Sequence, residues 1–386
     1  MTEWLAAALA VAGLGGWLWW RQRHSRAHKT DFGGDYFRGL NYLLNEQPDK
    51  ALEVFLQLAE VNPDTVETHL ALGNLFRRRG EVEHAIRCHE NIIAKSTISP
   101  AERHHALSEL AEDYRRAGLL DRAEDLYHQL ADDAENRQVA LGRLLDIYQQ
   151  EQDWPQAIEI GERLHAAGDT SRAPLIAHFH CERAAAALRD NQLDEARTAL
   201  AAAHQWHPES LRWRLLIAQL RLREQHPHEA VQTLRAALHE HPDLLPVALT
   251  TLTEAHRATG TLDQLRDELS QWLSERQDVS AALALTRMHQ AEGDYAHARE
   301  LLLQQLTQRP NVHLLATLLE QLDQAEYQQL SPRLRPIIEE LCTALLSDEV
   351  SYRCRQCGYG GHIHHWQCPG CRHWDTTWPV RGVTGE

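Results

Sequence analysis

Residues 70–86, LALGNLFRRRGEVEHAI, decide the fold, because a closely related pattern returns at residues 110–127 as LAEDYRRAGLLDRAEDLY. In both stretches an aromatic residue precedes a glycine, and an alanine (Ala85 or Ala123) opens the next helical segment. A small residue lets two helices cross closely, the aromatic ring fills the groove between them, and glycine permits a tight turn. The sequence therefore predicts helix–turn–helix units.

The small residue that opens the second helix recurs along most of the chain. Successive positions are 34, 38, 34, 39, 34 and 68 residues apart, and the last interval is twice 34. The unit that this double interval skips fits near Leu265. We therefore expect eight units over residues 32–310, stacked into a right-handed superhelix whose first helices line a concave groove. The aligned residues are Ala51, Ala85, Ala123, Ala157, Ala196, Ala230 and Ala298.

The amino-acid composition favours helix. The net charge argues against a nucleic-acid-binding protein, and the motifs that are absent argue against an enzyme. The body is rich in Ala, Leu, Glu, Arg and Gln, whose side chains lose little rotamer freedom in a helix. The 386 residues carry a net charge of −16, whereas a nucleic-acid partner requires clustered cations. The sequence contains no glycine-rich phosphate loop, nucleophile elbow or HExxH motif. We therefore assign no catalytic or cofactor-binding residues, and we expect a protein that is not an enzyme.

Residues 4–20, WLAAALAVAGLGGWLWW, contain no charged side chain. As a helix these 17 residues extend roughly 26 Å, enough for a thin hydrocarbon core. Tryptophans stand at both ends, as in membrane interfaces, and basic residues follow in RQRHSRAHK. The positive-inside rule then predicts a single-pass anchor over residues 1–21, a basic linker over 22–31 and a cytoplasmic body. A signal peptide, which carries its positive charge ahead of the apolar run, and a buried soluble helix are the alternatives.

Small residues recur every four positions within this apolar segment, at Ala8, Ala12 and Gly16. Such spacing lets two membrane helices approach closely. A homodimer through the anchor is one interpretation, and simple filler in a span rich in alanine and glycine is the other.

Arginines recur late in the first helix of several units. In repeats of this kind these positions often face the concave side, where guanidinium groups can bind carboxylates of a partner. The alternative is that they pair with neighbouring acids or lie in solvent. The candidate partner-binding residues are Arg77, Arg78, Arg115, Arg116, Arg189 and Arg223.

Four cysteines form two C-x-x-C pairs near the end of the chain. Cys354 and Cys357 make the first pair, and Cys368 and Cys371 follow after a gap of ten residues. Each pair can wrap a tight turn whose amides point at the sulfurs, and two facing turns make a tetrahedral thiolate cage. We therefore predict one metal ion held by these four ligands, with the intervening histidines 362, 364 and 365 as a weaker alternative.

The cysteine segment forms a small module of its own over residues 351–380, after further helices in 311–350. Its words CGY and CPGC resemble the two knuckles of rubredoxin, although Arg372 stands where glycine is usual and the gap is shorter. Iron and zinc both suit four thiolates. A module this short depends on its metal for folding. We expect its aromatic rings to pack it onto the last repeat helices as a closing cap or a docking surface; they are Tyr352, Trp366, Trp374 and Trp378.

The repeat pattern resembles the tetratricopeptide repeat. The whole order of anchor, repeats and knuckle resembles the lipopolysaccharide assembly protein B family of gram-negative bacteria. That resemblance implies an all-α tetratricopeptide superhelix in the inner membrane, facing the cytoplasm, with iron in the knuckle. It further implies an adaptor for the membrane protease FtsH that promotes degradation of the lipid A pathway deacetylase (LpxC) and contacts other lipopolysaccharide assembly proteins. A rubredoxin-like electron carrier and an assembly scaffold unconnected with proteolysis are the alternative functions.

Overall fold

The structure is a computed structural model that describes most of the chain beyond residue 65. The predicted anchor and basic linker lie outside the described residues. Among the residues that are described, no helix is both long enough and apolar enough to cross a membrane. The described residues are scattered positions between 34 and 54, and then 66–321, 334–348 and 350–386.

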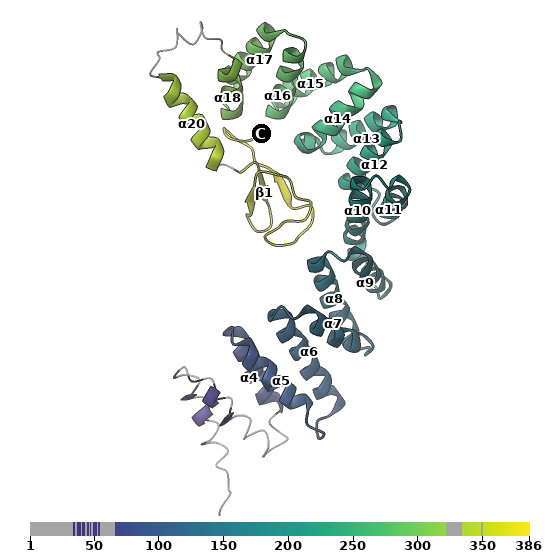
Figure 1. Cartoon of the computed structure of the whole chain (residues 1–386), viewed down its shortest axis with the longest axis vertical. Coiled ribbons are helices and arrows are strands. Elements are labelled where there is room, and N and C mark those ends of the chain that lie inside the picture. Colours follow the sequence, from purple (N-terminus) through teal and green to yellow (C-terminus); the bar gives the residue numbers. More distant parts are fainter. Residues whose placement is uncertain are drawn as a thin grey trace, which may run out of the picture. The chain divides into compact units, whose positions relative to one another are not determined.

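The chain divides into two compact units, Met1–Glu151 and Gln152–Glu386. In the first unit, the described helices beyond residue 65 pack in consecutive order (Figure 1). Helix α6 begins with a capping box, in which Ser99 and Glu102 each bond the other's backbone amide. The helices are α4 (Val66–Arg78), α5 (Val82–Ile93), α6 (Pro100–Arg116), α7 (Leu120–Ala131) and α8 (Arg137–Glu151).

The second unit is also built of consecutively packed helices and ends in the cysteine module. Short 3₁₀ turns, η2 (Thr170–Arg172) and η3 (Pro242–Leu244), precede two of its helices. The helices are α9 (Trp154–Ala166), α10 (Ala173–Arg189), α11 (Leu193–Trp206), α12 (Leu211–Arg223), α13 (Pro227–Glu240), α14 (Leu245–Thr259), α15 (Leu262–Arg276), α16 (Val279–Ala291), α17 (Tyr295–Gln308), α18 (Val312–Gln321) and α20 (Leu334–Asp348).

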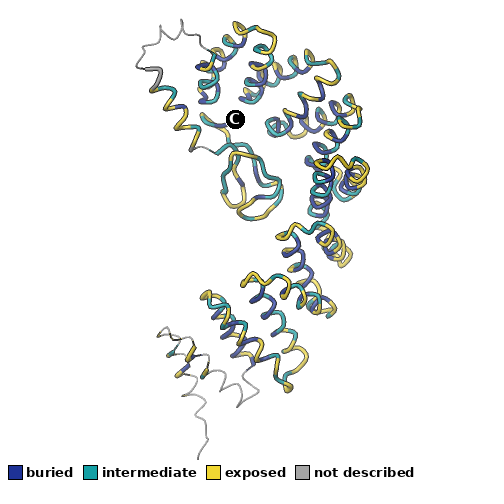
Figure 2. Tube along the Cα trace, in the orientation of Figure 1, coloured by how far each residue is buried: buried dark blue, intermediate teal, exposed yellow. Residues whose placement is uncertain are grey.

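The residues that align the repeats lie at the tightest part of the packing. A methyl group fits where two helices cross, so alanine is buried there without separating them. Buried and exposed positions alternate along the helices, which marks one packed side on each (Figure 2). Each aligned residue has 0% of its surface exposed; they are Ala51, Ala85, Ala123, Ala157, Ala196, Ala230, Leu265 and Ala298.

Glycine has a packing role in α4. A Cβ atom at Gly73 would lie 2.3 Å from the Nε2 atom of His89 on α5. Real Cβ atoms do not approach other heavy atoms so closely, so only glycine lets these two helices reach this distance. The neighbouring histidine therefore explains why position 73 is a glycine.

The cysteine module departs from an all-α fold because it contains a small sheet. Three antiparallel strands lie in the order β2-β1-β3. Tyr352 on β1 is opposite Gly361 on β2 and Pro379 on β3. The fold is thus a mostly helical repeat array with a short β-structured knuckle. The strands are β1 (Tyr352–Cys354), β2 (Gly360–Gly361) and β3 (Thr377–Pro379).

Candidate metal centre and arginine pocket

The two C-x-x-C turns of the knuckle share one hydrogen-bond scheme. In the first turn the amide of Gly358 donates to the carbonyl of Cys354 at 3.0 Å. In the second turn the amide of Arg372 donates to the carbonyl of Cys368 at 2.8 Å. Equivalent local geometry at both turns brings the paired sulfurs to the same side of each turn, as a shared metal requires.

Arg372 takes the backbone conformation that glycine has in the first turn. Its φ is 59°, and that of Gly358 is 79°. A residue with a Cβ atom meets a cost of roughly 1–2 kcal/mol in this left-handed region. The turn nevertheless keeps its hydrogen bond, so the unusual arginine does not abolish the second knuckle.

The four cysteine sulfurs form a cluster of the size that one metal ion needs. All four Sγ atoms lie within 4.8 Å of one another. Two of the Sγ–Sγ distances, Cys354–Cys371 and Cys357–Cys368, are 3.7 Å. A tetrahedral ion with thiolate bonds of about 2.3 Å sets its sulfurs about 3.8 Å apart. The residues therefore fit one four-coordinate ion, and this geometry suits iron and zinc equally.

The environments of the four thiols differ. Cys354 and Cys368 are buried, Cys371 is half-buried and Cys357 is exposed. Burial raises the pKa of Cys354, but hydrogen bonds with Thr376 and nearby backbone amides lower it to about 6. A backbone hydrogen bond at His373 lowers the pKa of Cys371, but burial and the neighbouring sulfurs raise it to about 12. A bound cation would favour the thiolate form of all four.

The knuckle is attached to the repeat helices through Trp374. Its indole stacks on the imidazole of His178, with ring centroids 4.7 Å apart and planes at 18°. Trp154 and Phe179 meet the same indole edge-on, at 6.2 and 6.1 Å. The partners of Trp374 lie on α9 and α10, so the expectation that the knuckle's rings pack onto the last repeat helices is wrong for this ring. Trp366, by contrast, packs against the hydrophobic cluster of the later helices α12–α18. Because Trp374 and its stacking partners are far apart in the sequence, no repeat or residue spacing indicates that they meet.

Two polar side chains complete this contact. His178 is 2% exposed, and its Nε2 atom lies 2.8 Å from a carboxylate oxygen of Asp375. Arg212 on α12 is 5% exposed, pairs with Glu182 at 2.8 Å and lies over the rings of Trp366 and Trp374. Sequence reasoning missed both His178 and Arg212. The tryptophans near the last cysteine were the signal that the module needs an aromatic contact.

The last residues of the chain make a second attachment, further along the repeats. The Asn311 side-chain amide donates to the carbonyls of Gly382 and Gly385, at 3.2 and 2.8 Å. The amide of Ser280 on α16 donates to the Glu386 side chain at 3.1 Å. The first helices α10, α12 and α16 are therefore contacted by the chain's own C-terminal segment, on the side where Figure 1 draws β1.

The candidate partner-binding residue Arg77 forms ion pairs with acids of its own unit. Its guanidinium donates to Asp113 at 2.9 Å and to the Glu109 carboxylate at 2.5 Å. Asp113 is fully buried and also bonds His89 at 2.5 Å. With 16% of its side chain exposed, Arg77 ties α4 to α6 and has little capacity for a partner.

Arg115 is also engaged by an acid. Its Nε and Nη2 atoms donate to the two carboxylate oxygens of Glu112, at 2.8 and 2.6 Å. Burial alone would raise the pKa of Glu112, but Arg115, Arg143 and Arg116 together lower it to about 2. Glu112 is therefore ionised throughout the physiological range, and Arg115 is its main partner.

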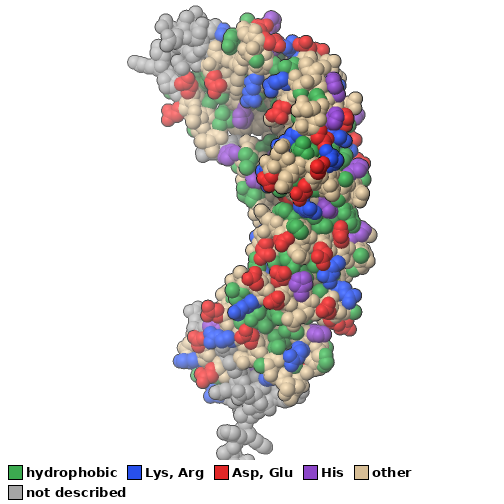
Figure 3. Space-filling view, turned by 45° about the vertical axis from the view of Figure 1, so that its right-hand side comes forward, with side chains coloured by type: hydrophobic (Ala, Val, Ile, Leu, Met, Phe, Trp, Pro, Cys, Tyr) green, Lys and Arg blue, Asp and Glu red, His purple; other side chains and the backbone are tan. Residues whose placement is uncertain are grey.

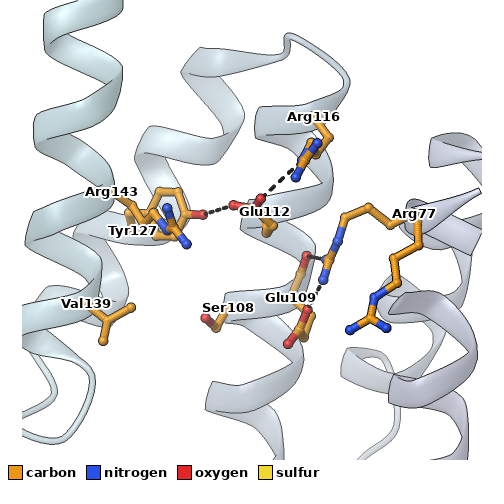
Figure 4. A pocket seen from close by; sticks show the side chains of 9 residues that line it. Arg77, Ser108, Glu109, Glu112, Arg116, Tyr127, Val139 and Arg143 are labelled. Carbon is orange, nitrogen blue, oxygen red and sulfur yellow. Dashed lines mark hydrogen bonds and ion pairs between the residues drawn. The ribbon is translucent and has the colours of Figure 1, made fainter. Parts of the chain in front are cut away.

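A cavity of about 490 Å³ opens beside these ion pairs, between α4, α6 and α8 (Figure 4). Arg78 and Arg116 line it, and so does Arg143, which the sequence did not single out. Arg189 and Arg223 are exposed at the ends of α10 and α12 in the other unit, outside this cavity. Partner binding by Arg78, Arg116, Arg189 and Arg223 stays a prediction.

The cavity differs from the general surface in its charge. On the face that Figure 3 shows, acidic and basic side chains of the described residues are interspersed. Arg78, by contrast, forms no ion pair with any residue that the structure describes, and Arg116 has 63% of its side chain exposed. The arginine pocket, defined by Arg78, Arg116 and Arg143, is thus a local concentration of available positive charge.

Family models match both parts of the chain. A rubredoxin metal binding domain matches residues 352–377. Tetratricopeptide repeat models match residues 38–88, 187–253 and 281–313. A crystal structure of a tetratricopeptide repeat protein from Parabacteroides merdae is 13% identical, with a TM-score of 0.34, over 67% of this chain and 98% of that chain. That likeness supports nothing about function.

Two curated relatives match the chain along nearly its whole length. Lipopolysaccharide assembly protein B of Escherichia coli K12 is 32% identical over 390 residues, covering 100% of both chains. The Haemophilus influenzae protein of the same name is 30% identical over 393 residues, covering 98% of each. The chain therefore belongs to the lipopolysaccharide assembly protein B family.

Proposed function

We propose that this chain is a non-enzymatic adaptor of the bacterial inner membrane that regulates lipopolysaccharide synthesis. Its proposed action is to promote FtsH-dependent degradation of the lipid A pathway deacetylase and to coordinate other lipopolysaccharide assembly proteins. The observation that carries this proposal is end-to-end similarity to a family named for lipopolysaccharide assembly, combined with a repeat array and a four-cysteine knuckle. The protease and the deacetylase enter from family resemblance.

Effective concentration supplies a physical mechanism for such an adaptor. Residues 4–20 have the length and apolar character of a membrane anchor. An anchor confines the repeat array to the plane in which a membrane protease works, so a client bound to the array meets the protease far more often. The repeats supply the surface, because stacked helix pairs expose an extended face for many small contacts.

The metal in this mechanism has a structural task. Cys354, Cys357, Cys368 and Cys371 would hold the ion, iron by family resemblance or zinc, and the ion would close the two turns. The closed knuckle then places Trp374 and Asp375 against His178. We expect the ion to organise this docking contact.

The proposal is tested by removing the anchor. A variant without residues 1–21 is expected to fold, because the described helices pack among themselves, but to leave the deacetylase long-lived in cells. The measurement is the half-life of the deacetylase, with the full chain re-expressed as the control. Normal turnover in cells that contain only the soluble variant would refute the adaptor mechanism.

An electron-transfer function is the second candidate, because the thiol of Cys357 is exposed and would bring the ion near solvent. Full cellular activity of a zinc-loaded protein would exclude it, since zinc has no accessible redox change. An assembly scaffold without proteolysis is distinguished by the half-life measurement, because it predicts the same deacetylase lifetime with and without this chain.

A further inference from the structure

We propose that the arginine pocket binds an extended, acidic segment of a partner protein, with one carboxylate on each of Arg78, Arg116 and Arg143. This inference rests on the proposed adaptor function, since it names the kind of client segment that the array captures. Of the six candidate arginines in the sequence pattern, Arg78 and Arg116 belong to this binding site. The third arginine, Arg143, is not part of that pattern.

The charge of the pocket is carried by side chains that lack strong partners. Arg116 lies 3.4 Å from an oxygen of Glu112 that Arg115 already holds at 2.6 Å. Arg143 is 44% exposed and reaches Asp146 only at 3.6 Å. Arg78 is exposed and unpaired within the described part of the chain. These three guanidinium groups can therefore gain charge-assisted hydrogen bonds without breaking strong ones.

The acids of the pocket cancel only part of this charge, because each makes its shortest ion pair with an arginine other than these three, although Glu112 also lies 3.4 Å from Arg116. Glu109 accepts from Arg77 at 2.5 Å, and Glu112 accepts from Arg115 at 2.6 Å. Figure 4 draws Glu109 bonded to Arg77, and Glu112 bonded more weakly to Arg116 and to the hydroxyl of Tyr127. Removing each carboxylate of a client from water is then compensated by a guanidinium group that has no strong partner of its own.

The positions of the arginines favour a chain over a small anion. Arg78 comes from α4, Arg116 from α6 and Arg143 from α8, which are alternate helices of the succession. Helix α4 contacts α6, and helices in contact lie roughly 8–10 Å apart, so one phosphate or carboxylate cannot span α4, α6 and α8. An extended polypeptide can, because it crosses the helices and carries a side chain to each.

The same spacing predicts the sequence of the bound segment. An extended chain in the polyproline II conformation advances about 3.1 Å per residue and has three residues per turn. Side chains three residues apart therefore point the same way and lie about 9 Å apart, close to the step between helices in contact. The partner should therefore carry Asp or Glu at every third position over seven residues. The residues between them meet a mixed lining, because Val139 is 62% exposed and the pocket also contains Ser108 and the hydroxyl of Tyr127.

The test is binding of synthetic peptides to the full-length chain in detergent. One peptide carries three glutamates at every third position, with threonine and proline between them to keep it extended. A second has the same composition with the glutamates adjacent. The protein variants are the triple substitution Arg78→Gln, Arg116→Gln and Arg143→Gln, and a control triple, Arg87→Gln, Arg103→Gln and Arg163→Gln, which removes equal charge from exposed positions outside the pocket.

We expect the spaced peptide to bind the unmodified chain and the control triple equally, and to bind the pocket triple about tenfold more weakly, since three exposed ion pairs each contribute a few-fold. Unchanged circular dichroism will show that the pocket triple is folded. Equal binding to both triples, no binding to the unmodified chain, or equal binding of the two peptides would overturn the proposal.

Failure here is separable from failure of the adaptor function. The lifetime of the deacetylase in cells with and without the full chain tests the adaptor function and involves no peptide. If the peptide fails to bind while the deacetylase is still destabilised by the full chain, the pocket assignment is wrong and the adaptor function stands.

Discussion

The imidazole of His178 and the indole of Trp374 stack with their centroids 4.7 Å apart, and this contact joins the knuckle to helix α10. The neighbouring Asp375 reinforces it with a 2.8 Å bond to the same histidine. A side chain two residues past the last turn of the metal site thus makes the principal aromatic contact with the repeats.

Truncation of this ring is expected to release the knuckle. Trp374→Ala removes contacts to Trp154, His178 and Phe179, at a cost on the order of 2–3 kcal/mol to the docked arrangement. Hydrogen exchange of α10 should accelerate while the metal content stays unchanged. Ile363→Ala is the matched control, because Ile363 lies on the same module and is 65% exposed. Equal exchange in both variants would contradict the docking role.

Removal of the metal is expected to unfold the knuckle but not the helices. The module has too few residues for a core, so Cys368→Ser or chelation should change tryptophan fluorescence and leave the far-ultraviolet helical signal nearly intact. Cys342→Ala supplies the control, since Cys342 lies on α20 outside the cluster and this variant should keep its metal. Loss of most helical signal on chelation would show that the repeats depend on the ion.

Two adjacent arginines should respond very differently to the same substitution. Arg77→Gln leaves the buried Asp113 and half-buried Glu109 without their cation, at a cost of about 3 kcal/mol. Arg78→Gln should change the free energy of unfolding by less than about 0.5 kcal/mol, because Arg78 is exposed. Urea denaturation of both variants measures the difference. Equal stabilities would mean that the Arg77 ion pairs contribute nothing.

Gly73 offers a test of close helix packing. Gly73→Ala puts a methyl group 2.3 Å from the His89 ring, which Asp113 holds in place, so we expect a loss of about 1–3 kcal/mol. Gly142→Ala is the control, because within the described part of the chain no heavy atom lies near its added Cβ, and alanine favours helix by up to about 1 kcal/mol. Thermal unfolding should therefore shift in opposite directions.

Acid is expected to lower the free energy of unfolding of the second unit, because His180 is buried and binds a proton more readily in the unfolded chain. This residue is 7% exposed, and burial, followed by repulsion from Arg183, lowers its pKa to about 4. In the unfolded chain its pKa is about 6.5, so between these values the unfolded state binds more protons. The associated stability is complete above pH 6.5 and is lost as the pH falls toward 4.

The size of this acid effect is on the order of 2–3 kcal/mol. His180→Leu should remove it, whereas substitution of His105, which has 59% of its side chain exposed, should leave the acid sensitivity unchanged. Unfolding of α10 by urea, monitored by hydrogen exchange at pH 7 and at pH 4.5, measures the acid sensitivity of each variant. Identical pH dependence in the His180 variant and the unmodified chain would refute the assignment.

Much of the fold could be predicted because its determinants are local or periodic. The interval of 34 residues recovers the crossing positions, and Ala85, Ala196 and Ala298 are all fully buried at helix crossings. The spacing of the cysteines identifies the sulfurs that cluster, since each C-x-x-C turn forms within a few residues. The strands of the knuckle were missed because two or three residues are too few for an alternating pattern to be visible.

The sequence by itself determined the repeat array and the cluster of four cysteine sulfurs, because spacing along the chain sets helix pairing and turn geometry directly. Only the tertiary structure decided that Trp374 packs on α10, that Arg77 is an internal ion-pair partner, and that Arg143 joins Arg78 and Arg116 at one pocket. These outcomes depend on which side chains meet across tens or hundreds of residues. Such meetings follow from how stacked helices are placed in space, and a one-dimensional period does not contain that placement.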